Sequence, residues 1–306
     1  MGLKNNLVFL IVIFLLYLFF SNINVYNISK IKKNNCDYEK IEFCFFKNII
    51  NIEKMDKPKI FVHINDEKKN ISGICQLCIE SVLKYCSNDY DIILYENTDV
   101  SELINDLEDP LCNIKNINLL SGKDLKQWEE YCKFKIIEKY GGVVMKPYFL
   151  FSSCPSYKEF NPKTLKICRV NNEGLSVSHQ NIIPTSSYMI AAPKNDNIVS
   201  IYIKYLDTLC RNNYTSDIKN FNKSFEKLYH LHYFPEDSIG IVDSQKNIIH
   251  LEQILKSVPL TLSTNNFCLF INIDLLKKKR HSGWIVNMSK EQILETNTVI
   301  SKYSKI

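Results

Sequence analysis

The fold of this chain is decided by one stretch, residues Glu129–Phe151, which reads EEYCKFKIIEKYGGVVMKPYFLF. Its first part continues an apolar stripe in which residues recur at intervals of three and four: Leu125, Trp128, Cys132, Ile136 and Tyr140. This spacing predicts an amphipathic helix. The Gly pair ends the helical pattern, and an apolar run follows it. The stretch therefore predicts a helix that feeds a strand through a tight turn, which is a common unit of α/β proteins.

The ends of this helix are also marked in the sequence. Ser121 followed by Asp124 predicts an N-terminal cap. Gly141 is expected to take the left-handed conformation after the last turn, where a Cβ atom would clash. Val143, Val144 and Met145 then predict a buried strand.

The same stretch resembles the motif of the DxD sugar-transferase families of the capsular polysaccharide synthesis and initiating mannosyltransferase type, which have a GT-A fold. Their pattern runs roughly S-D-x-x-R-x-x-x-L-x-x-Y-G-G-x-Y/W-x-D-x-D. Tyr140-Gly141-Gly142 matches it outright, and Ile137 takes the Leu position. Glu130 stands where the family has Asp, and Lys133 where it has Arg.

The match fails at the two Asp residues that hold the divalent cation in the family. Those positions hold Lys146 and Tyr148, with Pro147 between them. The family would use Mn²⁺ or Mg²⁺, but its ligands are absent here, so no cofactor and no metal site are predicted. No catalytic residue is assigned. The resemblance implies these candidates for nucleotide-sugar binding: Glu130, Lys133, Gly141, Gly142, Lys146 and His281.

Two functions follow from the resemblance. In the first, the chain transfers a sugar from a nucleotide-sugar donor to a glycan or polysaccharide acceptor, and Lys146 gives the diphosphate a fixed positive charge in place of the metal. In the second, the chain is a catalytically inactive protein with a transferase fold, which acts as a membrane-anchored glycan-binding or structural protein. Whether it is an enzyme stays open at this point, because Lys146 and Tyr148 replace the DxD pair.

Composition restricts the class of protein further. The chain has 306 residues, of which 45% are hydrophobic, so it can bury a sizeable core. The net charge of +5 comes from scattered lysines rather than from one basic block. No basic stripe with interleaved aromatic residues stands out, so no nucleic-acid partner is predicted.

The N-terminus carries an apolar run without charge, Leu7–Phe20, which reads LVFLIVIFLLYLFF. A signal anchor, a cleaved signal peptide and a buried core helix are the three interpretations. The anchor is preferred because no A-x-A-like cleavage site follows the bulky Phe19-Phe20 end. The expected organisation is a short tail over 1–6, a transmembrane signal anchor over 7–22, a stem over 23–56 and a glycosyltransferase-like domain over 57–306.

The anchor predicts a single-pass membrane protein of the endoplasmic reticulum or Golgi type. Positive charges do not favour a lumenal C-terminal domain, since one lysine precedes the run and three follow it closely. The resemblance does favour that orientation. Five N-x-S/T sequons would then become meaningful; they lie at Asn27, Asn70, Asn213, Asn222 and Asn287.

Eleven cysteines leave two interpretations open, disulfides in an oxidising lumen or buried free thiols. Cys75 and Cys78 form a C-x-x-C, but they fall on a predicted helix face, which favours packing over redox or metal chemistry. His230 and His232 lack a ligand partner at suitable spacing, so they are not predicted to bind metal.

The rest of the chain predicts a GT-A-like, mostly parallel sheet with helices on both faces, because strand and helix patterns alternate. Strands are expected at KPKIFVHI from Lys57, at 91–95, at 184–192 and at 267–273, and helices at 71–85, from Asn97 onward and from Ser289, where Gln292 completes a capping box. A further helix is expected to bury Ile198, Ile201, Tyr205 and Leu209.

In such sheets ligands bind at the carboxyl ends of the strands, and Gly141–Tyr148 is expected to arrive there. Arg280–Trp284 resembles the family's downstream His…Trp segment, which is why His281 is among the candidates.

Overall fold

A computed structural model describes residues 52, 55–64, 71–104, 122–170, 185–211, 229 and 231–305. Several features expected from the sequence lie outside these residues: the N-terminal tail, the anchor, nearly all of the stem, Ser121, His230 and the sequons other than Asn287. Within the described residues, no helix is both long enough and apolar enough to cross a membrane.

A six-stranded sheet forms the centre of the molecule, in the order β2-β1-β3-β6-β5-β7. Its strands are β1 (Lys59–His63), β2 (Asp91–Tyr95), β3 (Gly142–Met145), β5 (Lys166–Arg169), β6 (Thr185–Ala192) and β7 (His232–Tyr233). β1 pairs in parallel with both β2 and β3, and β5 pairs in parallel with β7. β6 runs antiparallel to its two neighbours, β3 and β5. The prediction of a mostly parallel sheet is therefore confirmed.

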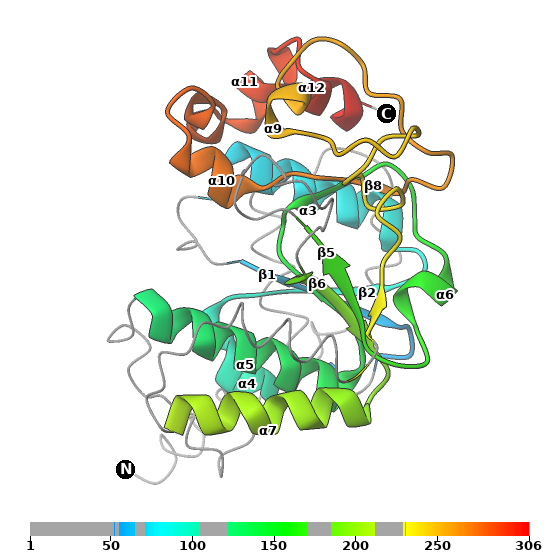
Figure 1. Ribbon diagram of the computed structural model, residues 1–306, viewed down its shortest axis with the longest axis vertical. Coiled ribbons are helices and arrows are strands. Elements are labelled where there is room, and N and C mark those ends of the chain that lie inside the picture. Colours follow the sequence, from blue (N-terminus) through cyan, green and yellow to red (C-terminus); the bar gives the residue numbers. More distant parts are fainter. Residues whose placement is uncertain are drawn as a thin grey trace, which may run out of the picture.

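Helices cover both faces of this sheet (Figure 1). One face carries α4 (Val100–Ile104), α5 (Gly122–Tyr140) and α7 (Asn197–Arg211). The other carries α3 (Gly73–Cys86), α10 (Ile273–Lys278), α11 (Lys290–Glu295) and α12 (Val299–Ser304). A two-stranded antiparallel sheet of β4 (Phe149–Phe151) and β8 (Cys268–Phe270) packs on α3. The short elements are η3 (Asn97–Asp99), α6 (Tyr157–Phe160), α9 (Leu251–Ile254) and η5 (Gly283–Asn287).

The central strands are apolar on both sides because each side meets a layer of helices. Val143 and Met145 of β3 belong to the core on the α3 side, whereas Val144 belongs to the core on the α5 side. All three side chains are fully buried. Successive side chains of a strand point to opposite faces, so an unbroken apolar run is what a strand between two helical layers requires.

Three sequence-based predictions need correction. On α7 the buried face is Val199, Tyr202, Ile203 and Leu206, while Ile201 is 40% exposed. The buried stripe is displaced by about one residue from the predicted one. The helical period of 3.6 fits the predicted and the observed stripe equally well, because this segment has two neighbouring apolar faces. The late strand covers only Cys268–Phe270, since Asn272 caps α10 by accepting a hydrogen bond from the Leu275 amide at 3.0 Å. The C-terminal segment forms two short helices rather than one; the predicted box of Ser289 and Gln292 caps the first.

The Gly pair that opens β3 has positive φ at both positions. Gly141 has φ of 67°, which confirms the prediction, and Gly142 has φ of 90°, which the sequence did not predict. A Cβ atom on Gly141 would lie 2.7 Å from the Lys194 amide nitrogen. On Gly142 it would lie 2.3 Å from the Lys59 carbonyl oxygen of β1. Side chains are therefore excluded here both by conformation and by space.

We expect Gly141→Val to lower the melting temperature, because a β-branched residue would be forced into the left-handed region against the backbone of Lys194. Such a residue costs on the order of 1–3 kcal/mol, and each kcal/mol corresponds to roughly 2–4 °C for a domain of this size. Thermal unfolding of the purified chain measures it. Gly283→Ala is the matched control, since its added Cβ would meet its nearest neighbour at 3.5 Å, an ordinary contact. An unchanged melting temperature for Gly141→Val would contradict this account of the turn.

Candidate functional site

A buried group of ionisable side chains lies at the carboxyl edge of the central sheet. We call it the carboxyl-edge cluster; it consists of His63, Glu129, Glu130, Lys133, Lys146 and Asp274. His63 ends β1, Lys146 follows β3, the two glutamates and Lys133 lie on α5, and Asp274 lies on α10. His63 is 1% exposed, Lys133 3% and Lys146 9%. Charged residues are almost never buried to this extent unless they are paired or serve a function.

The register of the sheet brings these elements together. Val62 of β1 stands opposite Met145 of β3 in a parallel pair. The next residues along the two strands, His63 and Lys146, therefore leave the sheet at the same edge. The carboxyl edge of parallel strands is also where α/β sheets bind their ligands.

Glu130 is held by donors from three different elements. The Lys133 ammonium lies 3.4 Å from its Oε2 in the same helix. The Ser187 hydroxyl of β6 donates a hydrogen bond to the same oxygen. The Tyr202 hydroxyl of α7 also hydrogen-bonds to Glu130. Lys133 and Glu130 therefore largely neutralise each other, and this part of the cluster is internally satisfied.

Asn97 links the end of β1 to α5. Its Oδ1 lies 2.7 Å from His63 Nε2, and its Nδ2 donates to Glu129 Oε1 at 3.2 Å. Because Oδ1 can only accept, His63 carries its proton on Nε2. Burial lowers the pKa of His63, as do the charges of Lys133 and Lys146, against the opposing effect of the Asn97 bond. The imidazole is therefore neutral at neutral pH, and its buried Nδ1 accepts no hydrogen bond from the described residues.

Asp274 receives hydrogen bonds from two tyrosines. Tyr148 donates to Oδ1 at 2.6 Å, and Tyr188 donates to Oδ2 at 3.2 Å. Burial alone would raise the pKa of Asp274, but the charge of Lys146 and the two hydroxyl groups outweigh it, so the pKa is lowered. The pKa values of both tyrosines are raised, first by burial and then by the Asp274 charge. Asp274 is thus an ionised carboxylate with both oxygens engaged.

Lys146 lies between these two tyrosines. Its ammonium is 5.6 Å from the ring centroid of Tyr148 and 5.5 Å from that of Tyr188, within the range of a cation–π contact. Burial lowers the pKa of Lys146, followed by the charge of Lys133, while Asp274 and the two glutamates of α5 oppose the shift. Among the described residues, none accepts a hydrogen bond from the Lys146 ammonium or forms an ion pair with it. Lys146 is therefore a buried cation whose three donors have capacity for a ligand.

The structure brings together only some of the residues that the sequence proposed. Glu130, Lys133 and Lys146 share the cluster. Gly141 and Gly142 lie at the amino end of β3, about 13 Å of strand away from Lys146 at 3.3 Å per residue. The expectation that the whole segment Gly141–Tyr148 reaches the carboxyl edge is therefore wrong for the Gly pair, because the strand itself separates them.

His281, the remaining candidate, is exposed on the loop after α10, and no described contact joins it to the cluster. The sequence did not predict three members of the cluster, His63, Glu129 and Asp274, or Asn97, which joins the first two. For His63 a signal existed, since it ends the strand that pairs with β3. Asp274 had none, because its position depends on how α10 packs.

The site does not fit a divalent cation. The two positions that carry the metal-binding Asp residues in the resembled family hold a buried ammonium and a tyrosine. Asp274 and Glu130 already accept hydrogen bonds from neighbouring side chains. No group of three or more His, Cys, Asp or Glu side chains within the described residues is arranged to hold a metal ion. The positive charge available to a ligand at this edge is that of Lys146.

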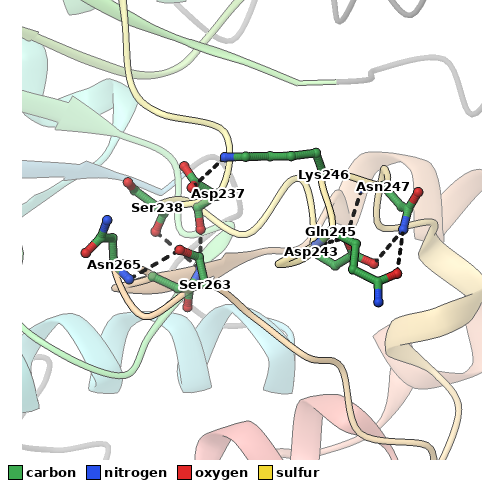
Figure 2. Close-up of polar contacts among 9 residues, drawn as sticks. Asp237, Ser238, Asp243, Gln245, Lys246, Asn247, Ser263 and Asn265 are labelled. Atoms are coloured by element: carbon green, nitrogen blue, oxygen red, sulfur yellow. Dashed lines mark hydrogen bonds and ion pairs between the residues drawn. The ribbon is translucent and has the colours of Figure 1, made fainter.

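A second polar group, on the turn after β7, has a structural explanation (Figure 2). Asp243 Oδ1 accepts hydrogen bonds from the amides of Gln245 at 2.9 Å and Asn247 at 2.8 Å. The Lys246 ammonium pairs with Asp237 at 2.7 Å. Lys246 has φ of 65°, and the turn it forms is bracketed by a bridge between Val242 and Ile248. These side chains fix a tight turn.

Comparison with known proteins adds little to this geometry. No family model and no curated protein matches the chain. Among solved structures, the chain is similar to one described as PaToxG Glycosyltransferase, with 11% sequence identity, 63% of this chain and 79% of that chain covered, and a TM-score of 0.33. A likeness of this size carries no functional argument.

We expect Lys146→Met to raise the melting temperature at neutral pH, because it removes a buried charge and keeps an unbranched side chain of similar length. The pKa of Lys146 is lower in the folded chain than in the unfolded chain, so the unfolded chain binds the additional proton between the two values. The free energy of unfolding of the wild type therefore rises with pH through that window. The difference in stability between Lys146→Met and the wild type should become smaller as the pH approaches the ordinary pKa of lysine.

Thermal unfolding of both proteins over a pH series measures this effect. Lys204→Met on α7 is the control, since Lys204 is exposed and its charge costs little. If Lys146→Met melts below the wild type at neutral pH, the lysine stabilises the fold and our account of its environment is wrong.

Proposed function

We propose that this chain is a glycosyltransferase-like protein that binds the diphosphate of a nucleotide sugar at the carboxyl-edge cluster and transfers the sugar to a glycan or polysaccharide acceptor without a divalent cation. The observation that carries the proposal is the buried Lys146 ammonium, which has no hydrogen-bond acceptor among the described residues. Burying such a charge costs several kcal/mol by general estimates, and an anionic ligand would recover that cost.

The chemistry of sugar transfer needs positive charge at this position. The bond between the anomeric carbon and the diphosphate oxygen breaks, and the acceptor oxygen forms a new bond to the same carbon. Negative charge accumulates on the departing diphosphate in the transition state. A fixed cation placed there stabilises that charge, as a metal ion does in other enzymes. Lysine supplies this charge as a point charge with three donors.

The surroundings of Lys146 support its use as a fixed charge. The rings of Tyr148 and Tyr188 flank the ammonium, and Asp274 holds both rings through their hydroxyl groups. His63 is neutral at neutral pH, so it adds no charge that would compete with Lys146. Glu130 already neutralises Lys133. The arrangement is therefore pre-organised, which lowers the cost of ordering groups when the ligand binds.

A non-catalytic function is the second candidate, and one observation favours it. Asp274 is the carboxylate that holds the tyrosines around Lys146, and both of its oxygens accept hydrogen bonds from them. A carboxylate engaged in this way is a poor general base for the acceptor hydroxyl. The chain would then bind a nucleotide sugar or a glycan without transferring it.

We expect the full-length chain to bind uridine or guanosine diphosphate sugars with the same affinity in the presence of manganese and of a chelator. The Lys146→Ala substitution should weaken binding by about tenfold or more, since hydrogen bonds to charged groups contribute roughly 1.5–3 kcal/mol. Titration calorimetry of the detergent-solubilised chain measures both effects. Lys204→Ala, at an exposed lysine on α7, is the control and should bind as the wild type does.

Three results separate the alternatives. Tight binding that requires manganese would refute the cation-independent site. Binding without turnover of the donor would favour the non-catalytic function. No binding under any condition would remove the nucleotide-sugar proposal altogether.

We also propose that the chain is a single-pass membrane protein, anchored through Leu7–Phe20, with residues 57–306 in the lumen of the endoplasmic reticulum or Golgi. The apolarity of that run and the lack of charge within it support this proposal, and residues 21–26 would extend the run towards the roughly 20 residues that span a bilayer. Asn287, the sequon asparagine within the described residues, is exposed at the end of η5.

Expression in a secretory host should therefore attach a glycan at Asn287, so that the Asn287→Gln variant migrates faster and loses part of the shift caused by an endoglycosidase. Asn265→Gln is the control, because Asn265 is exposed but belongs to no sequon. An endoglycosidase without effect on the wild type, together with digestion of the domain by a protease added from the cytosolic side, would rule out the lumenal orientation.

A further inference from the structure

Two thiols lie close together at the carboxyl end of α3. Cys86 is the last residue of α3 and is fully buried. Cys154 lies in the segment that leads from β4 to α6 and is partly exposed. The two side chains are close enough to influence each other's pKa, although they belong to different elements of the fold.

Other contacts hold the two segments in this arrangement. The Cys154 thiol also lies 3.4 Å from the Asp89 carboxylate, in the turn that follows α3. The Asp89 amide in turn donates to the Cys86 carbonyl at 3.1 Å. The Tyr90 hydroxyl donates to the Pro155 carbonyl at 3.4 Å. The juxtaposition of the thiols is therefore fixed by backbone and side-chain bonds on both sides of it.

Exposure distinguishes Cys154 from the other cysteines whose side chains the structure describes. Cys75, Cys78, Cys132, Cys168 and Cys268 are all buried. Within this group, a reagent in solution reaches Cys154 first. The neighbouring Cys86 also lowers the pKa of Cys154, and this effect outweighs the opposing effects of burial and of Asp89. Cys154 is thus the better nucleophile of the two, because the thiolate is the reactive form.

We propose that Cys86 and Cys154 form a reversible disulfide by exchange with a disulfide compound such as oxidised glutathione. The Cys154 thiolate attacks one sulfur of the compound, a mixed disulfide forms on Cys154, and one thiolate leaves. The sulfur of the buried Cys86 then attacks the Cys154 sulfur, and the Cys86 proton passes to the departing sulfur, which leaves as a thiol. Two protein thiols are oxidised, and one disulfide of the compound is reduced to two thiols.

The bond would join the end of α3 to the segment that leaves β4. Both elements belong to the layer that supports Lys146, because β4 begins three residues after it and packs against α3. A covalent link there restricts the unfolded chain and stabilises the fold. The proposal stands independently of the proposed sugar transfer, since it needs neither a nucleotide sugar nor Lys146.

The test uses the purified full-length chain in glutathione buffers of increasing oxidising strength. Free thiols are blocked by alkylation, and peptides are then identified by mass spectrometry without reduction. We expect a linked peptide pair that contains Cys86 and Cys154, and a higher melting temperature for the oxidised chain than for the reduced chain. Cys154→Ser should abolish both effects.

A second variant traps the intermediate. Cys86→Ser removes the resolving thiol, so Cys154 should accumulate as a mixed disulfide with one glutathione. Cys132→Ala, which changes a buried cysteine in the opposite layer, should leave the Cys86–Cys154 link unchanged. The proposal is overturned if both thiols of the wild type remain free to alkylation in the most oxidising buffer, or if Cys154 pairs with a different cysteine.

Discussion

The close approach of Gly142 to the Lys59 carbonyl is the constraint on which the central sheet depends. Any side chain at Gly142 would place its Cβ 2.3 Å from that oxygen and would push β3 away from β1. With glycine there, β3 enters the sheet beside β1, and Val62 comes opposite Met145. That register carries His63 and Lys146 to the same edge. The glycine at the amino end of β3 therefore determines which side chains meet at the carboxyl end. The Gly pair contributes to the site by positioning the backbone and does not contact the cluster.

Burial of the carboxyl-edge cluster destabilises the fold electrostatically. Two lysines lie nearly inaccessible beside each other, and each lowers the pKa of His63. Lys133 is compensated by Glu130, which Ser187 and Tyr202 also hold. Lys146 is not paired in this way, since two ring faces flank it and the carboxylates of Asp274, Glu129 and Glu130 act on it only through their charge. A fold without use for this charge would be more stable with an apolar side chain there, and this asymmetry between the two lysines is the physical reason to assign a ligand to Lys146.

The sequence predicted the layers of the fold well because periodicity reports burial directly. The strands at Lys59–His63 and Gly142–Met145 and the stripe of α5 were predictable from apolar spacing alone. Burial of Lys146, Lys133 and Glu130 was not, since charged residues in a helical or strand pattern are ordinarily read as the solvated face. Asp274 could not be predicted for a different reason. It meets Tyr148 only through the packing of α10, which lies more than a hundred residues further along the chain. The displaced stripe of α7 shows the limit of periodicity itself, because Ile198, Val199, Ile201 and Tyr202 offer two neighbouring apolar faces and only the sheet selects one.

The packing around Tyr148 makes this position unsuited to a metal-binding aspartate. Tyr148 is 6% exposed, and its hydroxyl bonds Asp274. Its carbonyl accepts the Ile271 amide at 2.7 Å, and its amide donates to the Lys146 carbonyl at 2.8 Å. An aspartate at this position would lose the ring that packs against Tyr188 and would bring a second carboxylate towards Asp274. Two carboxylates that close repel each other unless a cation lies between them. The tyrosine, Asp274 and Lys146 are therefore mutually dependent, and a charge supplied by lysine is the state that this arrangement of β4 and α10 supports.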